Sequence, residues 1–295
     1  MKFIFTILIL TISLLNCKPS QNVIEKELNV VFTGNSLTYL HEMPLLVQAM
    51  VDEIHPNIKI HQSTFPSMSL TGHINSIIVS KSENGISGRQ KTENEIIKTE
   101  KKIKARRWDI VILQNGEVSV LNPNSRKYVP GKAIVDIKVL VDNRDCHFML
   151  FSTWISLRDY PKKHSYSSRD ITALEEDRCS PTINNPKEEI TLLNEAYTEL
   201  TRRNKLTKPS HGDKFYEIRT QHPNVNLYEE NSHPNEAGSF LNACIFYELL
   251  TNSKAPSLKY VGNIEPEIAR LLKKSHINIH YEQNSTNNRS HERNW

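Results

Sequence analysis

The chain has 295 residues, of which 38% are hydrophobic and 24% are charged. This composition is typical of globular proteins and excludes disordered, collagen-like and coiled-coil chains. The 37 Lys and Arg residues exceed the 33 Asp and Glu residues only slightly, and the two signs are interspersed. Nucleic-acid binding requires a concentrated basic face, so no nucleic-acid partner is predicted. The longest basic run, residues 101–107, follows several glutamates and is interpreted as a solvated helix face.

The first 16 residues are predicted to form a signal peptide. Lys2 precedes an apolar run from Phe3 to Leu15, which is too short for a comfortable transmembrane helix. Cys17 follows the run and resembles the acylated cysteine of bacterial lipoproteins, although Asn16 stands where those signals usually have a small residue. We therefore expect an exported protein, anchored to a bacterial membrane by lipid on Cys17, with residues 17–27 as a tether. The alternative is an ordinary secretory signal that contains a cysteine.

The remaining cysteines and the histidines give no pattern of metal ligands. Cys146, Cys179 and Cys244 cannot all pair with one another, and no two of them have zinc-ligand spacing. The 12 histidines are scattered along the chain. The sequence therefore predicts no metal, no organic cofactor and no disulfide framework.

Strand-like and helix-like segments alternate from residue 28 onwards. In chain order we predict strands at 28–33, 58–65, 109–113, 148–154 and 225–228, and helices at 44–54, 96–107, 133–141, 187–204 and 234–250. This alternation predicts one three-layer α/β/α domain over residues 28–278, with a mainly parallel sheet. Long polar loops at 80–91 and 158–186 are expected to be functional or mobile, and the polar tail 279–295 is expected to be disordered.

The first candidate catalytic residue is Ser36, in a Gly-Asn-Ser run directly after the first predicted strand. Ligands bind at the carboxyl ends of strands in open parallel sheets. Gly34 permits a sharp turn, after which the Ser36 hydroxyl lies near the start of the next helix, where backbone N–H groups can stabilise negative charge. The alternative is that Ser36 is an ordinary N-cap serine.

A second motif joins Glu230 and His233, just before the helix predicted to begin at Pro234. A carboxylate three residues before a histidine in a tight turn can accept a hydrogen bond from Nδ1, which leaves Nε2 free to act as a base. The alternative is a surface glutamate and a histidine that caps the helix. His222 also precedes a proline, but it has Arg219 instead of a carboxylate three residues earlier.

A third motif follows the buried strand predicted at 109–113. The amide of Gln114 can donate a hydrogen bond to an oxyanion in the same cleft. The next residue, Asn115, points to the opposite face of the strand, so the two amides cannot both do this. A turn begun by Asn115 and Gly116 is compatible with this interpretation.

Together the three motifs resemble the SGNH (GDSL-type) hydrolase superfamily, and most closely a bacterial lipoprotein branch with Gly-Asn-Ser in the first block. The resemblance extends over roughly residues 28–250 and includes the Ser-Thr-Trp run at 152–154. It implies an SGNH, flavodoxin-like fold, with Ser36 as nucleophile, His233 as general base and acid, and Glu230 as the carboxylate that orients it. The implied oxyanion donors are the Ser36 backbone N–H, a backbone N–H near Ser67 and the Gln114 side chain.

Two positions depart from that family pattern. Glu230 stands where the family normally has Asp, and the glycine of the family's second block falls on one of residues 66–68, none of which is glycine. We predict a monomeric serine esterase acting on carbohydrate O-acetyl groups or on lipid or short-chain esters. The alternative is a catalytically impaired surface lipoprotein that keeps the fold and binds a partner. A third option, an interaction scaffold that uses the basic helix around Lys101, has little support.

Overall fold

The computed structural model describes residues 26–74, 77–82, 85–90, 92–165, 179–230 and 232–275 of the chain. The predicted signal peptide, Cys17 and the predicted polar tail 279–295 lie outside the described residues, as does most of the predicted tether.

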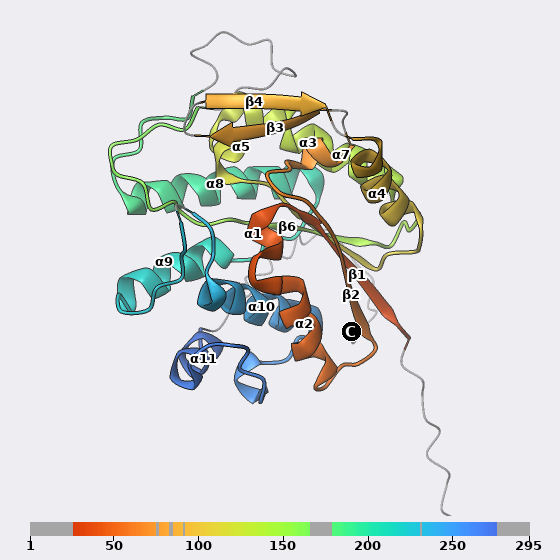
Figure 1. The fold of residues 1–295 in the computed structure, drawn as a ribbon, viewed down its shortest axis with the longest axis vertical. Helices are drawn as coiled ribbons and strands as arrows, with labels where there is room; N and C mark the ends of the chain where they lie inside the picture. Colours follow the sequence, from red (N-terminus) through yellow and green to blue (C-terminus); the bar gives the residue numbers. More distant parts are fainter. Residues whose placement is uncertain are drawn as a thin grey trace, which may run out of the picture.

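Four parallel strands form the central sheet (Figure 1). They are β1 (Leu28–Gly34), β2 (Ile58–Thr64), β5 (Ile110–Gln114) and β6 (His147–Phe151), in the order β2-β1-β5-β6. Every neighbouring pair is parallel. Four of the predicted strands are confirmed. The strand predicted at 225–228 is wrong. Of these four residues, all of which the structure describes, only Tyr228 forms a β-bridge, and this is an isolated one with Pro234.

Helices connect and cover the strands. The longer ones are α2 (Met43–Asp52), α4 (Glu93–Lys104), α7 (Pro130–Leu140), α8 (Pro186–Asn204), α9 (His211–Gln221), α10 (Glu236–Thr251) and α11 (Pro266–Lys273). Shorter turns are α1 (Ser36–Tyr39), η1 (Leu40–Glu42), α3 (Leu70–Ile74), α5 (Glu117–Leu121), α6 (Pro123–Tyr128) and η3 (Ala255–Ser257). The five predicted helices correspond to α2, α4, α7, α8 and α10, whereas α9 and α11 were not predicted.

Alternate residues of the strands pack into two cores, one on each face of the sheet. Phe32 and Phe151 belong to one core, together with side chains of α2, α10 and α11. Val31 and Leu150 belong to the other, together with side chains of α7 and α8. Because successive residues of a strand point to opposite faces, strands between two helix layers carry apolar residues on both faces. The predicted three-layer α/β/α fold is confirmed (Figure 1).

The segment expected to be a polar loop at 80–91 belongs to a hairpin. Strands β3 (Ile77–Ser82) and β4 (Gly85–Gln90) pair with each other in antiparallel fashion and form a separate two-stranded sheet. An antiparallel pair joined by a short connection satisfies its own backbone hydrogen bonds. Its sequence therefore need not contain a continuous apolar run such as the one in β5.

The described ends of the predicted loop 158–186 are ordered and bound to α8. Lys162 pairs with Ile183 in a β-bridge. Glu189 of α8 is fully buried, with the Lys162 Nζ 2.7 Å and the His164 Nε2 3.2 Å from its carboxylate. A buried carboxylate requires such partners, because an unpaired charge in the interior is strongly unfavourable. These contacts connect both ends of the loop to the helix layer.

The stability of the fold is expected to depend on pH through His211. Its ring is fully buried against Phe151 and Phe246, with ring centroids 4.3 and 4.4 Å apart. Burial lowers the pKa of His211 well below its usual 6.5. Below about pH 6.5 the unfolded chain therefore binds a proton that the folded chain does not, so the free energy of unfolding falls as the pH decreases.

We expect His211→Phe to make this dependence less steep, by about 1.4 kcal/mol per pH unit between pH ~6 and ~5. Urea unfolding of the parent and the variant across this range measures it. An unchanged slope would show that His211 is protonated in the folded protein.

Candidate active site

The segments that follow β1, β2 and β5 lie together at the carboxyl edge of the parallel sheet. Gly34 ends β1 and Gln114 ends β5, and these two strands are neighbours. The segment after β2 joins them, since the Phe65 N–H donates to the Gly34 carbonyl at 3.2 Å. This edge is where open α/β sheets bind their ligands.

Ser36 is the first residue of α1. The cap of this helix is Asn35, whose side chain accepts a hydrogen bond from the Leu37 N–H at 3.1 Å. The interpretation of Ser36 as an N-cap serine is therefore wrong. Because the first N–H groups of a helix have no acceptor within it, the Ser36 N–H is available to another acceptor. The residue as a whole is half-buried.

The hydroxyl of Ser36 is in contact with His233. Its Oγ lies 2.9 Å from the His233 Nε2, across 197 positions of sequence. The loop that carries the histidine is fixed by the Trp154 indole N–H, which donates to the Ser232 carbonyl at 2.8 Å. The cap of α10 is Asn235, not His233. The interpretation of His233 as a helix cap is therefore wrong, and the predicted approach of the serine to the histidine is present.

The two neighbouring glutamates of this loop have different surroundings. Glu230 is exposed, and its backbone carbonyl accepts a hydrogen bond from the His233 N–H at 3.2 Å. Within the described residues its carboxylate has no hydrogen bond or ion pair. The carboxylate of Glu229 lies 2.8 Å from the His41 Nε2. The role assigned to Glu230 thus stays a prediction.

Gln114 presents an unpaired amide N–H beside the serine. Its Oε1 accepts hydrogen bonds from the Asn35 N–H at 2.8 Å and from the Thr38 hydroxyl at 3.1 Å. These donors determine which end of the amide is the oxygen. The Nε2 is buried and has no partner within the described part of the chain. Asn115 instead accepts from the Leu70 N–H at 3.0 Å, so only Gln114 belongs to the serine side.

Ser67 has the backbone conformation of a glycine. Its φ is +54°, in the left-handed region, and it follows Pro66 in a turn closed by a 3.3 Å hydrogen bond from the Met68 N–H to the Phe65 carbonyl. A type II turn has this pattern, with Pro first and a positive φ second. Among residues 66–68, where the resemblance places the family glycine, only Ser67 has a positive φ.

We expect Ser67→Gly to raise the free energy of unfolding by ~0.5–1 kcal/mol. A left-handed conformation costs an L-residue about 1–2 kcal/mol, and part of this gain is offset by the greater freedom of glycine in the unfolded chain. Denaturant unfolding measures the change, and Ser67→Ala is the matched control, which keeps the strain. A variant Ser67→Gly that is less stable than Ser67→Ala would contradict this assignment.

Two histidines beside the site were not singled out by the sequence. His41 pairs with Glu229 and has a φ of +50°, and His73 contacts the Gly34 carbonyl with its Nε2 at 3.0 Å. His73 lies in α3, a short helix whose first residue is Leu70. No motif of the sequence connects either histidine with Ser36.

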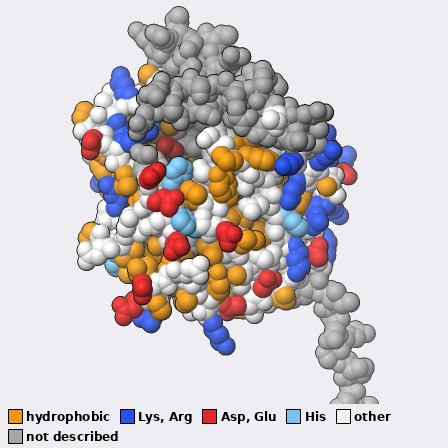
Figure 2. Space-filling view, viewed as in Figure 1, with side chains coloured by type: hydrophobic (Ala, Val, Ile, Leu, Met, Phe, Trp, Pro, Cys, Tyr) orange, Lys and Arg blue, Asp and Glu red, His pale blue; other side chains and the backbone are white. Residues whose placement is uncertain are grey.

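Charged side chains are unevenly distributed over the face shown in Figure 2. Histidine and acidic side chains gather between α1 and α9, next to hydrophobic side chains, whereas Lys and Arg side chains line the edge near α4 (Figure 2). Lys101, Lys104, Arg106 and Arg107 are all exposed. The interpretation of the basic run as a solvated face agrees with this exposure.

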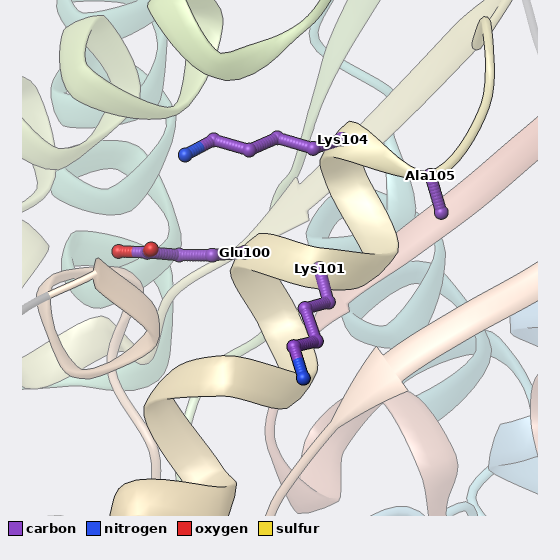
Figure 3. Close-up of a pocket in the computed structure, with 4 residues that line it drawn as sticks. All are labelled: Glu100, Lys101, Lys104 and Ala105. Atoms are coloured by element: carbon purple, nitrogen blue, oxygen red, sulfur yellow. The ribbon is translucent and has the colours of Figure 1, made fainter.

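A pocket of about 340 Å³ lies on α4, apart from the predicted site residues. It is lined by Glu100, Lys101, Lys104 and Ala105. Glu100 and Lys104 point to one side of the helix and Lys101 points away from them (Figure 3). These side chains do not converge on a common point, and the lining includes no serine or histidine. We therefore place no chemistry there.

The remaining groups of interest are thiols and potential metal ligands. Cys146, Cys179 and Cys244 are free, and burial raises the pKa of the Cys146 thiol to about 12. Across the described ranges, no three His, Cys, Asp or Glu side chains come close enough together to hold a metal ion. None of the helices in those ranges has the length and apolar character needed to cross a membrane.

Comparison with known proteins shows which solved structures have a similar fold. No protein-family model matches the sequence. No curated protein matches it either. A DUF4886 family protein from Bacteroides uniformis aligns with a TM-score of 0.58 and 15% identity, over 84% of this chain and 92% of that one. A putative SGNH hydrolase from Slackia heliotrinireducens aligns with a TM-score of 0.52 and 16% identity, over 76% and 100% of the two chains. The chain therefore has an SGNH-like α/β fold, a four-stranded parallel sheet flanked by helices.

Proposed function

We propose that this protein is a serine esterase in which Ser36 is the nucleophile and His233 is the general base. The observation that carries the proposal is the 2.9 Å contact between the Ser36 Oγ and the His233 Nε2. A nucleophile and a base within hydrogen-bond reach are the core of covalent acyl transfer. Their position at the carboxyl edge of the sheet, where both residues are half-buried, supports the same conclusion.

The reaction proceeds in two steps. The Ser36 Oγ attacks the ester carbonyl while its proton passes to the His233 Nε2, and a tetrahedral oxyanion forms. Collapse of this intermediate breaks the bond to the alcohol, which leaves with the proton from His233. Water then attacks the acyl-enzyme and gives a proton to His233. The bond from the acyl carbon to the Ser36 Oγ breaks, His233 returns the proton to that oxygen, and the acid leaves.

Three groups are assigned to the oxyanion. The N–H groups of Ser36 and Ser67 supply backbone donors, and the Gln114 Nε2 supplies a side-chain donor. The unpaired, buried state of that Nε2 supports its role, because buried donors in native proteins nearly always have an acceptor. An acyl oxygen carrying negative charge is a suitable acceptor.

Glu230 is proposed to orient His233 and to stabilise the imidazolium that forms during the reaction. It lies three residues before the histidine in the same turn. The carboxylate of its neighbour Glu229 is already paired with His41. Glu230 is therefore the carboxylate of this turn that is free to take the role.

A panel of short-chain aryl esters, acetylated sugars and lipid esters tests the proposal. We expect hydrolysis of at least one of these ester classes by the parent protein and none by Ser36→Ala. The ester that is hydrolysed fastest identifies the substrate class, carbohydrate O-acetyl or lipid. Equal background rates for both proteins would favour the alternative, a binding protein that keeps the fold without catalysis.

We further propose that the protein is exported and anchored to a bacterial membrane through lipid on Cys17. The apolar run that ends at this cysteine and the polar residues after it support the proposal. Each buried CH₂ contributes ~0.8 kcal/mol, and stable attachment requires more than one acyl chain.

We expect intact-mass analysis of membrane-extracted protein to give a mature chain that begins at Cys17 and carries acyl groups. Cys17→Ala is expected to move the protein to the soluble fraction. A different N-terminus, or a mature chain without added acyl mass, would contradict this anchoring.

A further inference from the structure

A second set of buried hydrogen bonds reaches the turn before Ser36. His73 of α3 is fully buried, and its Nε2 lies 3.0 Å from the Gly34 carbonyl oxygen. Its Nδ1 lies 3.0 Å from the hydroxyl of Thr99, which is also fully buried. The Ser63 hydroxyl lies 3.0 Å from the same Thr99 oxygen. Four segments that are distant in sequence are thus connected by three hydrogen bonds.

The hydrogen-bonding partners of His73 determine which atoms of this set of hydrogen bonds carry the protons. A carbonyl oxygen only accepts, so the His73 Nε2 carries the proton and donates to Gly34. In a neutral imidazole the other nitrogen is then an acceptor, and the Thr99 hydroxyl donates to Nδ1. The Ser63 hydroxyl in turn donates to Thr99. A neutral His73 in one tautomer is compatible with all three hydrogen bonds.

This set of hydrogen bonds ends at the peptide group between Gly34 and Asn35, immediately before the nucleophile. The Gly34 carbonyl and the Asn35 N–H belong to one planar unit. His73 and the Phe65 N–H donate to its oxygen, and its N–H donates to the Gln114 Oε1 at 2.8 Å. Both ends of this peptide are therefore fixed. Because its N–H occupies the Gln114 oxygen, the peptide also determines which way the unpaired Nε2 of that amide points.

A histidine that merely fills space does not explain this arrangement. An apolar ring at this site would leave the Gly34 carbonyl with one donor instead of two and the Thr99 hydroxyl without its nitrogen partner. The cost of such losses is largest where the backbone must be held in one orientation, as it is beside a nucleophile.

We propose that His73 is a positioning residue for the esterase reaction. Through the peptide between Gly34 and Asn35 it holds the turn that carries Ser36 and orients the Gln114 amide toward the oxyanion. This inference rests on the proposed function, because Ser36 and Gln114 are given the roles described there. His73 itself does not touch the reacting atoms.

Steady-state kinetics on an aryl acetate test the proposal. We expect His73→Leu to lower kcat by about 30- to 100-fold with KM changed less than about threefold, because a misplaced oxyanion donor weakens binding of the transition state only. His73→Gln can still donate to the Gly34 carbonyl from a similar place, and it is expected to recover at least about tenfold of that loss. Thr99→Val removes the partner of Nδ1 and of the Ser63 hydroxyl but leaves the His73 contact with the Gly34 carbonyl, so it should cost less.

A matched control lies at the other end of the same sheet. His147 is the first residue of β6 and contacts Thr207, away from the carboxyl edge. We expect His147→Gln to leave kcat unchanged. Equal kcat losses in His73→Leu and His73→Gln would overturn the proposal, and so would a His73→Leu variant that is less stable but turns over at the parent rate.

An NMR measurement separates failure of this inference from failure of the proposed function. The side-chain amide signal of Gln114, assigned by its loss in Gln114→Glu, is expected to shift in His73→Leu and to return toward the parent position in His73→Gln. If the parent hydrolyses no ester but these shifts are seen, the positioning contact stands and the esterase assignment fails. An unmoved Gln114 signal in His73→Leu would refute the positioning role whatever the activity.

Discussion

Ser36→Ala, His233→Ala and the double variant are all expected to lower kcat to the same background. The Ser36 Oγ and the His233 Nε2 form a single contact of 2.9 Å, so removing either atom abolishes the same proton transfer. In comparable catalytic units one such substitution costs about 10⁶ in kcat, and further substitutions add little. We expect a loss of at least about 10⁵ for each variant, equivalent to ~7 kcal/mol of transition-state stabilisation. Hydrolysis of the best ester from the panel measures it.

Ser257→Ala is the matched control, because Ser257 lies on η3 and bonds only to the Lys254 carbonyl within the described residues. This control should turn over at the parent rate. If the double variant were slower than the parent by the product of the two separate losses, the serine and the histidine would be acting independently. The proposed proton transfer between them would then be wrong.

Glu230→Gln is expected to lower kcat by about 10² or more. An orienting carboxylate that also stabilises the imidazolium can contribute ~10⁴, and exposure of Glu230 to solvent weakens its electrostatic effect. Glu230→Asp restores the residue usual in the resembling family and should change kcat by less than about tenfold, ~1.4 kcal/mol. Initial rates at saturating ester measure both variants.

The neighbouring glutamate provides the control for this substitution. Glu229→Gln keeps a group that can hydrogen-bond to His41, and we expect it to change kcat by less than about tenfold. A harmless Glu230→Gln together with an inactive Ser36→Ala would identify a Ser-His dyad. If Glu229→Gln lowered kcat more than Glu230→Gln does, the orienting role would belong to the pair of Glu229 and His41.

The elements that could be predicted best from the sequence are the strands whose two faces are both buried. The strands β1, β5 and β6 lie between two helix layers, so each contains a run of apolar residues that is followed by polar ones. The polar residues at those ends, Ser36 and Gln114, then lie together because parallel strands share one carboxyl edge. His233 could be placed with them only through its resemblance to a known family, since no local pattern relates it to Ser36.

Other features depend on tertiary contacts that leave little trace in the sequence. Residues 225–228 have strand-forming side chains, but the described part of the sheet ends at β2 and β6, and the segment pairs with neither. Helix α9 buries few apolar residues, so it has no clear helical stripe. The orientation of the Gln114 amide is set by the Asn35 N–H and by Thr38, which no spacing rule relates to it.

Covalent labelling with a fluorophosphonate tests the central assignment most directly. Attack by an activated serine displaces fluoride and leaves a phosphonyl group on its Oγ, without requiring the natural ester. We predict one adduct, on the peptide that contains Ser36, and labelling at least about 100-fold slower in His233→Ala, which lacks the base. An adduct on a different serine, or none under conditions that label a known serine esterase, would contradict the assignment of Ser36 as an activated nucleophile.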